Sequence, residues 1–369
     1  MNPICLCLTA HEPHRLRPYN YFDVGRRHDY WDAESMRRRL ATAERLVYEP
    51  ATAKLAGLLD QHPAFAFSLA ISGPLLDQLA AFAPKLLAAF RSLVETGRAE
   101  LLCATSHHCL SWAVSASQVE KQLRLQRERL RRALGREPTI FGGEGPRETQ
   151  AFASIAEAVG LTGMLLESGP TLPDDLSRRH VYSASSRSHF PTMVTTPGLP
   201  EDIARDGDIL CLAVDLSTEG LRRRRNRVTL SHLEEWLRTA LSRGIEFLTP
   251  SEAFSRLPPT RALPAKAARS PIANELQQDA LDRLAALESR IMAAGALPMV
   301  EDFRRLTGSD HFGEMTLRAT ESTAQESEPE TFDSPYEAYM SFRHVLSDLD
   351  RRLSLSGLQP ALSAGSAPA

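Results

Sequence analysis

Cysteine is scarce in this chain of 369 residues, and the few thiols do not form the pattern of a disulfide-stapled fold. Their number is odd, and most of them lie within apolar runs. Small secreted domains that depend on disulfides carry many more cysteines per residue. We therefore predict reduced thiols, mostly in the core of a cytoplasmic protein, at Cys5, Cys7, Cys103, Cys109 and Cys211.

Long hydrophobic runs and an excess of either charge are also missing. No stretch reaches the ~18 apolar residues that a membrane helix needs, and the N-terminus lacks the basic region of a signal peptide. Lys and Arg number 43 against 46 Asp and Glu, a net charge of −3. Such a balance gives no general attraction for a polyanion. We expect neither a membrane nor a nucleic acid as partner, and a cytoplasmic location.

Short apolar runs alternate with amphipathic helical patterns from Ile4 to Leu248. This alternation is typical of parallel βα units. One helix is predicted to open with the capping box Ser117–Glu120 and to end at Gly135, and a second to open at Ser231. The candidate strands are residues 4–9, 65–71, 100–103, 139–141, 162–166, 209–214 and 246–248. About seven such units favour a closed or nearly closed barrel, although an open doubly wound sheet would give a similar pattern.

The pattern changes after residue 255, where prolines interrupt regular structure as a linker would. Apolar spacing predicts a long helix over residues 276–291. Ser334 and Pro335 combine a cap with proline at the first helical position, and this predicts a last helix that ends near Leu353. We therefore predict an α/β protein with a barrel domain over 1–255, a helical domain over 256–354 and a disordered tail over 355–369.

Three stretches follow predicted strands, where the active sites of βα barrels are found. His11 and Glu12 close the first strand, Glu144 and Glu148 lie in a glycine-rich turn, and Asp215 ends an apolar run. An aspartate at the end of an apolar strand is half desolvated, which suits it to general acid work. The alternative is that Asp215 caps the next turn.

These stretches and others along the chain resemble glycoside hydrolase family 57, most nearly its α-amylase-type members. Residues 4–13 are similar to the family's first motif, which ends in His-Gln-Pro, and here the ending is His11-Glu12-Pro13. The further matching stretches are residues 15–23, 68–73, 96–102, 105–110, 308–312, 334–338 and 345–350.

The resemblance implies a distorted (β/α)7 barrel followed by a C-terminal helical domain. It also implies retention of configuration with two carboxylates roughly 5–5.5 Å apart. Glu148 falls at the nucleophile position, with Glu144 as the alternative because the turn is longer than the family's, and Asp215 falls at the acid/base position. The implied sugar contacts are His11, His108, Asp310 and His311. No metal or other cofactor is implied.

Three departures from the family bear on activity. The acid/base motif, Asp-Tyr-Glu-Thr-Phe-Gly-Glu-His in the family, begins here as Asp215-Leu-Ser-Thr-Glu-Gly220, and Pro271 stands where the family has a Trp. Aromatic residues make up 7% of the chain, which leaves few rings to stack on sugars.

We therefore favour an enzyme that hydrolyses or transfers α-1,4-glucosidic bonds of an α-glucan or maltooligosaccharide. The first alternative is an inactive relative that binds sugar or regulates glucan metabolism. The second is a metal-dependent deacetylase on a related barrel, for which the candidate ligands are His107, His108, Cys109, Cys103 and, from the first strand, Cys5, Cys7 and His11. The basic run Arg222–Arg225 is interpreted as a solvated loop, with anion binding as its alternative. The sequence carries no signal for an oligomeric state.

Overall fold

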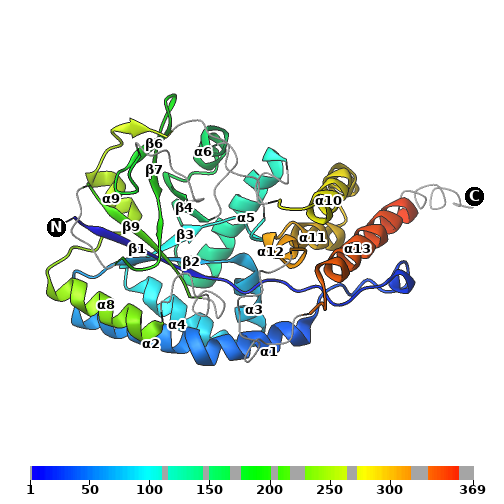
Figure 1. The fold of residues 1–369 in the computed structure, drawn as a ribbon, viewed down its shortest axis with the longest axis horizontal. Helices are drawn as coiled ribbons and strands as arrows, with labels where there is room; N and C mark the ends of the chain where they lie inside the picture. Colours follow the sequence, from blue (N-terminus) through cyan, green and yellow to red (C-terminus); the bar gives the residue numbers. More distant parts are fainter. Residues whose placement is uncertain are drawn as a thin grey trace, which may run out of the picture. The chain divides into compact units, whose positions relative to one another are not determined.

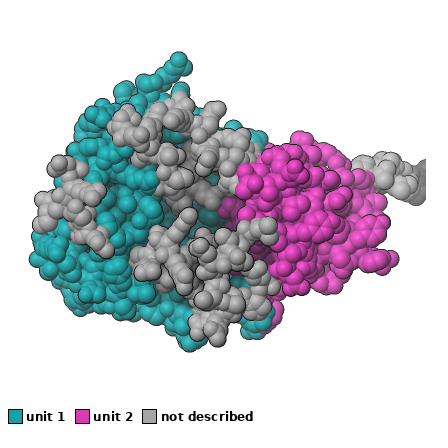
Figure 2. Space-filling model, viewed as in Figure 1, with its two compact units in different colours: residues 1–12, 37–269 teal, residues 13–36, 270–369 magenta. Residues whose placement is uncertain are grey.

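The structure, a computed structural model (Figure 1), describes residues 2–109, 115–143, 149–166, 176–200, 207–216, 229–263, 272–316 and 331–356. The chain forms two compact units (Figure 2). The first unit contains residues 1–12 and 37–269, and the second contains residues 13–36 and 270–369. Residues 13–36, which lie inside the barrel domain expected from the sequence, thus group with the C-terminal helices.

A curled sheet of mostly parallel strands organises the first unit. Its central strands follow the order β9-β1-β2-β3-β4-β5-β7, and each pairs in parallel with the next. Their bounds are β1 Ile4–Ala10, β2 Phe67–Ile71, β3 Ala99–Cys103, β4 Ile140–Gly143, β5 Gly163–Leu166, β7 Ser188–Val194 and β9 Leu210–Asp215. Because the strands are parallel, they all end at one edge, which we call the carboxyl edge.

One segment joins the two flanks of this sheet. After β7, a single residue, Thr195, leads into β8 (Thr196–Pro197). The β7 strand pairs with β5, whereas Thr196 of β8 pairs with Leu212 of β9. The same stretch of chain therefore reaches from one flank of the parallel strands to the other, as the predicted barrel requires. Beyond β7 lie the antiparallel β6 (Tyr182–Ser185) and the short β10 (Arg261–Ala262).

The strand prediction was wrong at one place. Residues 246–248 form only an isolated bridge, between Phe247 and Ile4, and the seventh parallel strand is β7 instead. Pro191 within β7 argues against a strand because proline cannot donate to the ladder. The other six predicted strands are present, with small changes at their ends.

Amphipathic helices cover the sheet. Their bounds are α1 Ala33–Ala43, α2 Glu49–Gln61, α3 Gly73–Phe82, α4 Pro84–Glu95, α5 Ala116–Leu134, α6 Thr149–Ala158, α8 Leu230–Ser242 and α9 Pro250–Arg256, and a π-helical turn, Glu44–Tyr48, leads into α2. Helices α2, α4 and α8 lie side by side (Figure 1). Ser115 and Thr229 cap α5 and α8, two residues before the predicted Ser117 and Ser231, and Gly135 ends α5 with φ +83° as its cap role requires.

All five cysteines are buried and free, which confirms the thiol prediction, and three of them, Cys5, Cys7 and Cys211, line the interior of the curled sheet.

The second unit contains α10 Glu275–Ala294, α11 Leu297–Leu306, α12 Ser309–Glu314, α13 Pro335–Ser356 and the short helix η1 Tyr21–Asp23. The predicted helices at 276 and 335 are thus confirmed, although α13 runs two residues into the predicted tail. None of the helices described has the length and apolar content to cross a bilayer.

Buried Asp348 of α13 holds segment 13–36 within the second unit. Its carboxylate accepts hydrogen bonds from the Gly25 amide at 2.5 Å and from the Tyr30 hydroxyl, and it pairs with His28 Nδ1 at 2.7 Å. Three neighbours satisfy a carboxylate that is fully removed from solvent, as a buried charge requires.

Gly73 packs so closely that we expect Gly73→Ala to destabilise the first unit. A Cβ there would lie 1.7 Å from the Ser106 carbonyl oxygen, so backbone would have to move. The expected loss is about 1–3 kcal/mol or more in the free energy of unfolding, measured by urea titration. Gly57→Ala, where a Cβ meets nothing within 4 Å inside α2, is the matched control. That control should gain about 0.5–1 kcal/mol. Equal effects of the two substitutions would contradict the prediction.

Candidate functional site

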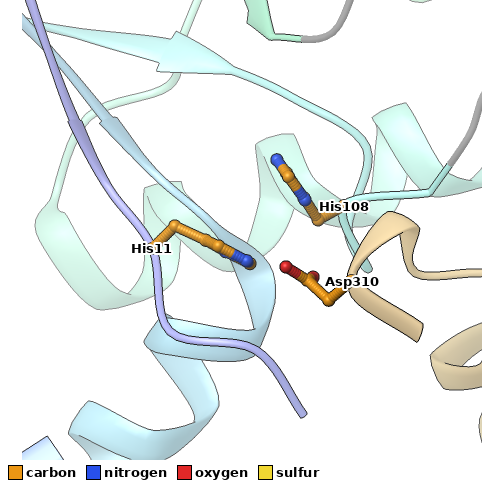
Figure 3. A group of neighbouring side chains, drawn as sticks. All are labelled: His11, His108 and Asp310. Atoms are coloured by element: carbon orange, nitrogen blue, oxygen red, sulfur yellow. The ribbon is translucent and has the colours of Figure 1, made fainter. Parts of the chain in front are cut away.

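His11, immediately after β1, is the centre of a side-chain cluster at the carboxyl edge. Its Nδ1 lies 2.8 Å from Ser72 Oγ, the first residue after β2. Its ring also stacks on His108, which follows β3, with centroids 4.2 Å apart and an interplanar angle of 27° (Figure 3). The chain segments that leave three neighbouring strands therefore meet at one imidazole.

His108 has an unusual backbone conformation. Its φ is +53°, and no other non-glycine residue in the described ranges has a positive φ. The turn is held by Thr105, whose carbonyl accepts from the His108 amide at 3.1 Å and whose Oγ1 accepts from the Cys109 amide at 2.9 Å. A left-handed backbone is costly for a side chain of this size, and such outliers gather at functional sites. His108 is therefore a candidate functional residue.

A buried tyrosine and a buried carboxyl group lie beside His11. The Tyr48 hydroxyl is 3.3 Å from both the His11 carbonyl oxygen and Glu12 Oε1, and it donates to them. Burial raises the pKa of Tyr48 well above its ordinary value, and the carboxylates of Glu12 and Asp215 raise it further. Tyr48 is therefore a permanent hydrogen-bond donor, within electrostatic range of two acidic groups.

Asp215 ends β9, next to the end of β1. Its Cα partner across the strands is Thr9, two residues before His11, and the amide of Leu216 donates to the Thr9 carbonyl at 2.8 Å. The Asp215 side chain is exposed, not half desolvated as its place at the end of an apolar run predicts. The reason is that a strand's last residue leaves the sheet where the packing against neighbouring layers ends.

Several of the predicted residues lie outside the described ranges. Glu144 and Glu148 are among them, as are Arg222–Arg225 and Pro271. Strand β4, which precedes the two glutamates, ends at Gly143 on the carboxyl edge. Going around the curled sheet from β4 to β9, three strands intervene on one side, and β5 with the β7–β8 segment on the other. The ends of β4 and β9 are therefore on opposite sides of the ring.

The two predicted residues of the second unit differ in their surroundings. Asp310, labelled in Figure 3, is half-buried in the first turn of α12. The ring of His311 is buried, with centroid distances of 5.9 Å to both Trp31 and Phe342, and its Nε2 lies 3.2 Å from the Arg305 carbonyl oxygen. A sugar contact by either residue stays a prediction from the resemblance.

Sequence reasoning missed Tyr48 and did not single out Ser72. Tyr48 belongs to a π-helical turn inside an apolar pattern, so it is indistinguishable from a core aromatic by spacing. Ser72 precedes Gly73-Pro74 and is predictable as a helix cap, a role it also has: its Oγ accepts from the Leu75 amide at 3.3 Å. Its contact with His11 has no local signal.

As for metal ligands, the described residues of the first unit bring His11 and His108 together without a third ligating side chain from the same unit. The arrangement suits hydrogen bonding to a polar ligand at the carboxyl edge.

Comparison with known proteins identifies the fold. Residues 5–187 match the family model for glycosyl hydrolase family 57. No curated protein matches by sequence. Among solved structures, the chain is similar to a 4-alpha-glucanotransferase from Thermococcus litoralis, with 13% identity and a TM-score of 0.61 over 84% of this chain and 54% of that one. A GH57-type branching enzyme from Pyrococcus horikoshii has 12% identity and a TM-score of 0.62 over 85% of both chains. The alpha-amylase AmyC from Thermotoga maritima has 11% identity and a TM-score of 0.62 over 96% of this chain and 94% of that one. The predicted fold class is confirmed.

His311 is expected to make the second unit sensitive to acid. Burial lowers its pKa from 6.5 to about 4. Between those values the unfolded chain binds a proton that the folded chain does not, so stability is complete above pH 6.5 and falls as the pH drops towards 4. His311→Gln keeps an N–H donor for Arg305 but removes this titration. The loss of unfolding free energy from pH 7 to pH 5 should therefore be about 2 kcal/mol smaller in the variant.

Chemical denaturation at the two pH values measures this difference. Phe303→Leu, a buried change in the same unit without a titrating group, is the control and should lower stability equally at both pH values. An unchanged pH dependence in His311→Gln would contradict the prediction.

Proposed function

Because residues 5–187 belong to glycosyl hydrolase family 57, we propose that this protein acts on α-1,4-glucosidic bonds of an α-glucan, by hydrolysis or transfer with retention of configuration. In this proposal Asp215 is the general acid/base and Glu148 the nucleophile, with Glu144 as the alternative nucleophile. The substrate is an α-glucan or maltooligosaccharide, and the setting is the cytoplasm. No metal or cofactor takes part.

The observation that carries the proposal is the position of Asp215. It ends β9 beside the segment that bears His11, at the same edge where His108 and Ser72 converge. Solved structures of similar fold are named as a glucanotransferase, a branching enzyme and an alpha-amylase.

The strand order supports a pair of carboxylates acting from two sides. Retaining glycosidases need one group to protonate the leaving oxygen and a second to attack the anomeric carbon from the opposite face. Asp215 is the last residue of β9, and in the sequence the two candidate glutamates come after β4, on the opposite side of the ring. The exposed Asp215 carboxyl group is open to substrate and to the water that enters in the second step.

His11 and His108 are proposed to bind sugar hydroxyl groups. Ser72 Oγ holds His11 through Nδ1, which fixes the orientation of the ring at this edge. Asp310 and His311 remain proposed sugar contacts on the resemblance alone.

A second candidate is an inactive relative that binds α-glucan. Its support is the sequence after Asp215, which continues Leu-Ser-Thr-Glu-Gly, so that the aromatic, acidic and histidine positions of the family's motif hold other residues. The buried Glu12, where the family has Gln, is a further difference beside His11. Both candidates place sugar at the same edge, so catalysis distinguishes them.

Activity on amylose and maltooligosaccharides tests the roles of the carboxylates. Asp215→Asn and one of Glu148→Gln or Glu144→Gln should lower reducing-sugar release by at least about 10²–10⁴-fold, since each removes a group that transfers a proton or attacks. Glu235→Gln, an exposed change on α8, is the matched control and should retain full activity.

Wild-type protein that shows no activity would also decide between the two candidates. Wild-type protein that releases no sugar but melts at a higher temperature with maltooligosaccharide would support the binding relative and reject the enzyme. Wild type that neither turns over nor is stabilised would reject both.

A further inference from the structure

Three buried glutamines contact the backbone next to His11 and next to the two residues that touch it, Ser72 and His108. They belong to helices α3 and α5, and each is at most 3% exposed: Gln78, Gln122 and Gln126. A buried amide is costly unless its polar atoms are hydrogen-bonded, and leucine would pack at such positions without that cost. What their side chains contact is therefore informative.

Each glutamine contacts the backbone where one strand ends. Gln78 Nε2 donates to the Glu12 carbonyl at 2.9 Å, just after β1. Gln126 Nε2 donates to the Ile71 carbonyl at 3.0 Å, at the last residue of β2. Gln122 Oε1 accepts from the His107 amide at 3.3 Å, in the loop after β3. At each of three adjacent strands, a buried glutamine side chain thus bonds to the backbone at the strand end or in the loop that follows it.

The residues so held are immediate chain neighbours of the cluster. Glu12 follows His11, Ile71 precedes Ser72, and His107 precedes His108. Gln122 and Gln126 are one turn apart on α5, so a single helix face sets the positions of both contacts of His11. A shift of α5 would move the hydroxyl and the stacking ring together.

Arg129 extends the same face of α5. Its Nη2 donates to the Gly73 carbonyl at 3.1 Å and pairs with Asp77 of α3. The loops after β2 and β3 are also in such close contact that a Cβ on Gly73 would collide with Ser106. The glutamines therefore act within a tightly packed support, in which a small side-chain change has little room to relax.

We propose that Gln78, Gln122 and Gln126 are positioning residues that hold His11 and His108 in the stacked arrangement that receives the sugar. The part about sugar rests on the proposed function. The part about the imidazoles does not, since it concerns the protein without ligand.

The direction of each hydrogen bond gives a specific test. A carboxylate can replace Gln122 as acceptor for the His107 amide, but it cannot donate to the Ile71 carbonyl in place of Gln126. Gln122→Glu and Gln126→Glu place the same group on the same helix, and they are compared above the pKa that burial raises, where both are ionised and can only accept. We expect Gln122→Glu to keep the His11–His108 arrangement and Gln126→Glu to lose it, whereas Gln122→Met and Gln126→Met both lose it.

The readout is the imidazole NMR signals of ¹⁵N-histidine-labelled full-length protein, assigned through His11→Gln and His108→Gln. Positioning predicts that the two assigned signals shift or broaden in both Met variants and in Gln126→Glu. Gln118→Met is the matched control: Gln118 lies one turn before Gln122 and is equally buried, and its Oε1, like that of Gln126, has no hydrogen-bond partner in the part of the chain that the structure describes. It should leave both signals in place. Thermal unfolding verifies that every variant is folded.

Maltooligosaccharide binding is measured on the same samples. If wild type binds, the Met variants at 122 and 126 should bind about tenfold more weakly or worse, as supporting residues around a site commonly do, with Gln118→Met unchanged. If wild type does not bind, the proposed function fails while the NMR result still decides the positioning. Signals of His11 and His108 that stay unshifted in folded Gln122→Met and Gln126→Met, or that shift equally in Gln118→Met, would overturn the proposal. If Gln122→Met or Gln126→Met does not fold, Gln78→Met takes its place. Gln78 contacts the backbone after the remaining strand, β1.

Discussion

Parallel strands that end at one edge leave backbone groups there without ladder partners, and a folded chain must satisfy those that are buried. In this protein the requirement is met largely by side chains. The side-chain amides of Gln78, Gln122 and Gln126 and the hydroxyl of Tyr48 all bond to backbone at the end of β1, β2 or β3 or in the loop that follows. The geometry of the His11 cluster depends on these contacts, because they set where each departing segment begins.

Each unit contains a tyrosine hydroxyl that donates to a buried acidic side chain. In the first, the buried Tyr48 hydroxyl donates to the buried carboxyl group of Glu12, and in the second, Tyr30 donates to the buried carboxylate of Asp348. A tyrosine whose pKa is raised by burial keeps its proton and so remains a donor. Each pair also joins distant parts of the chain, so the removal of one partner would take a hydrogen bond from a buried polar group.

Local signals in the sequence predicted much of the architecture. Apolar runs identified six of the seven parallel strands, and Gly135, Pro335 and the spacing of leucines identified helix ends and faces. The failures also have physical causes. Strand β7 contains Pro191, which is tolerated because its neighbour β6 is a short antiparallel strand with a register shift at this point. The caps of α5 and α8 fall at Ser115 and Thr229 because two hydroxyl residues compete at each start and only the contact with the helix amides decides between them.

The sequence by itself determined the alternation of strands and helices, the burial of reduced cysteines and the resemblance to a glycosidase family, because these depend on local periodicity, composition and short motifs. The tertiary structure alone decided which polar groups meet. Gln126 and Ile71 are 55 residues apart, Gln78 and Glu12 are 66 apart, and His11 and Ser72 are 61 apart. Periodicity carries no information over such separations, since it reports only whether a position faces the core. A buried glutamine and a misplaced polar residue therefore look the same in the sequence until folding brings the partner within hydrogen-bonding distance.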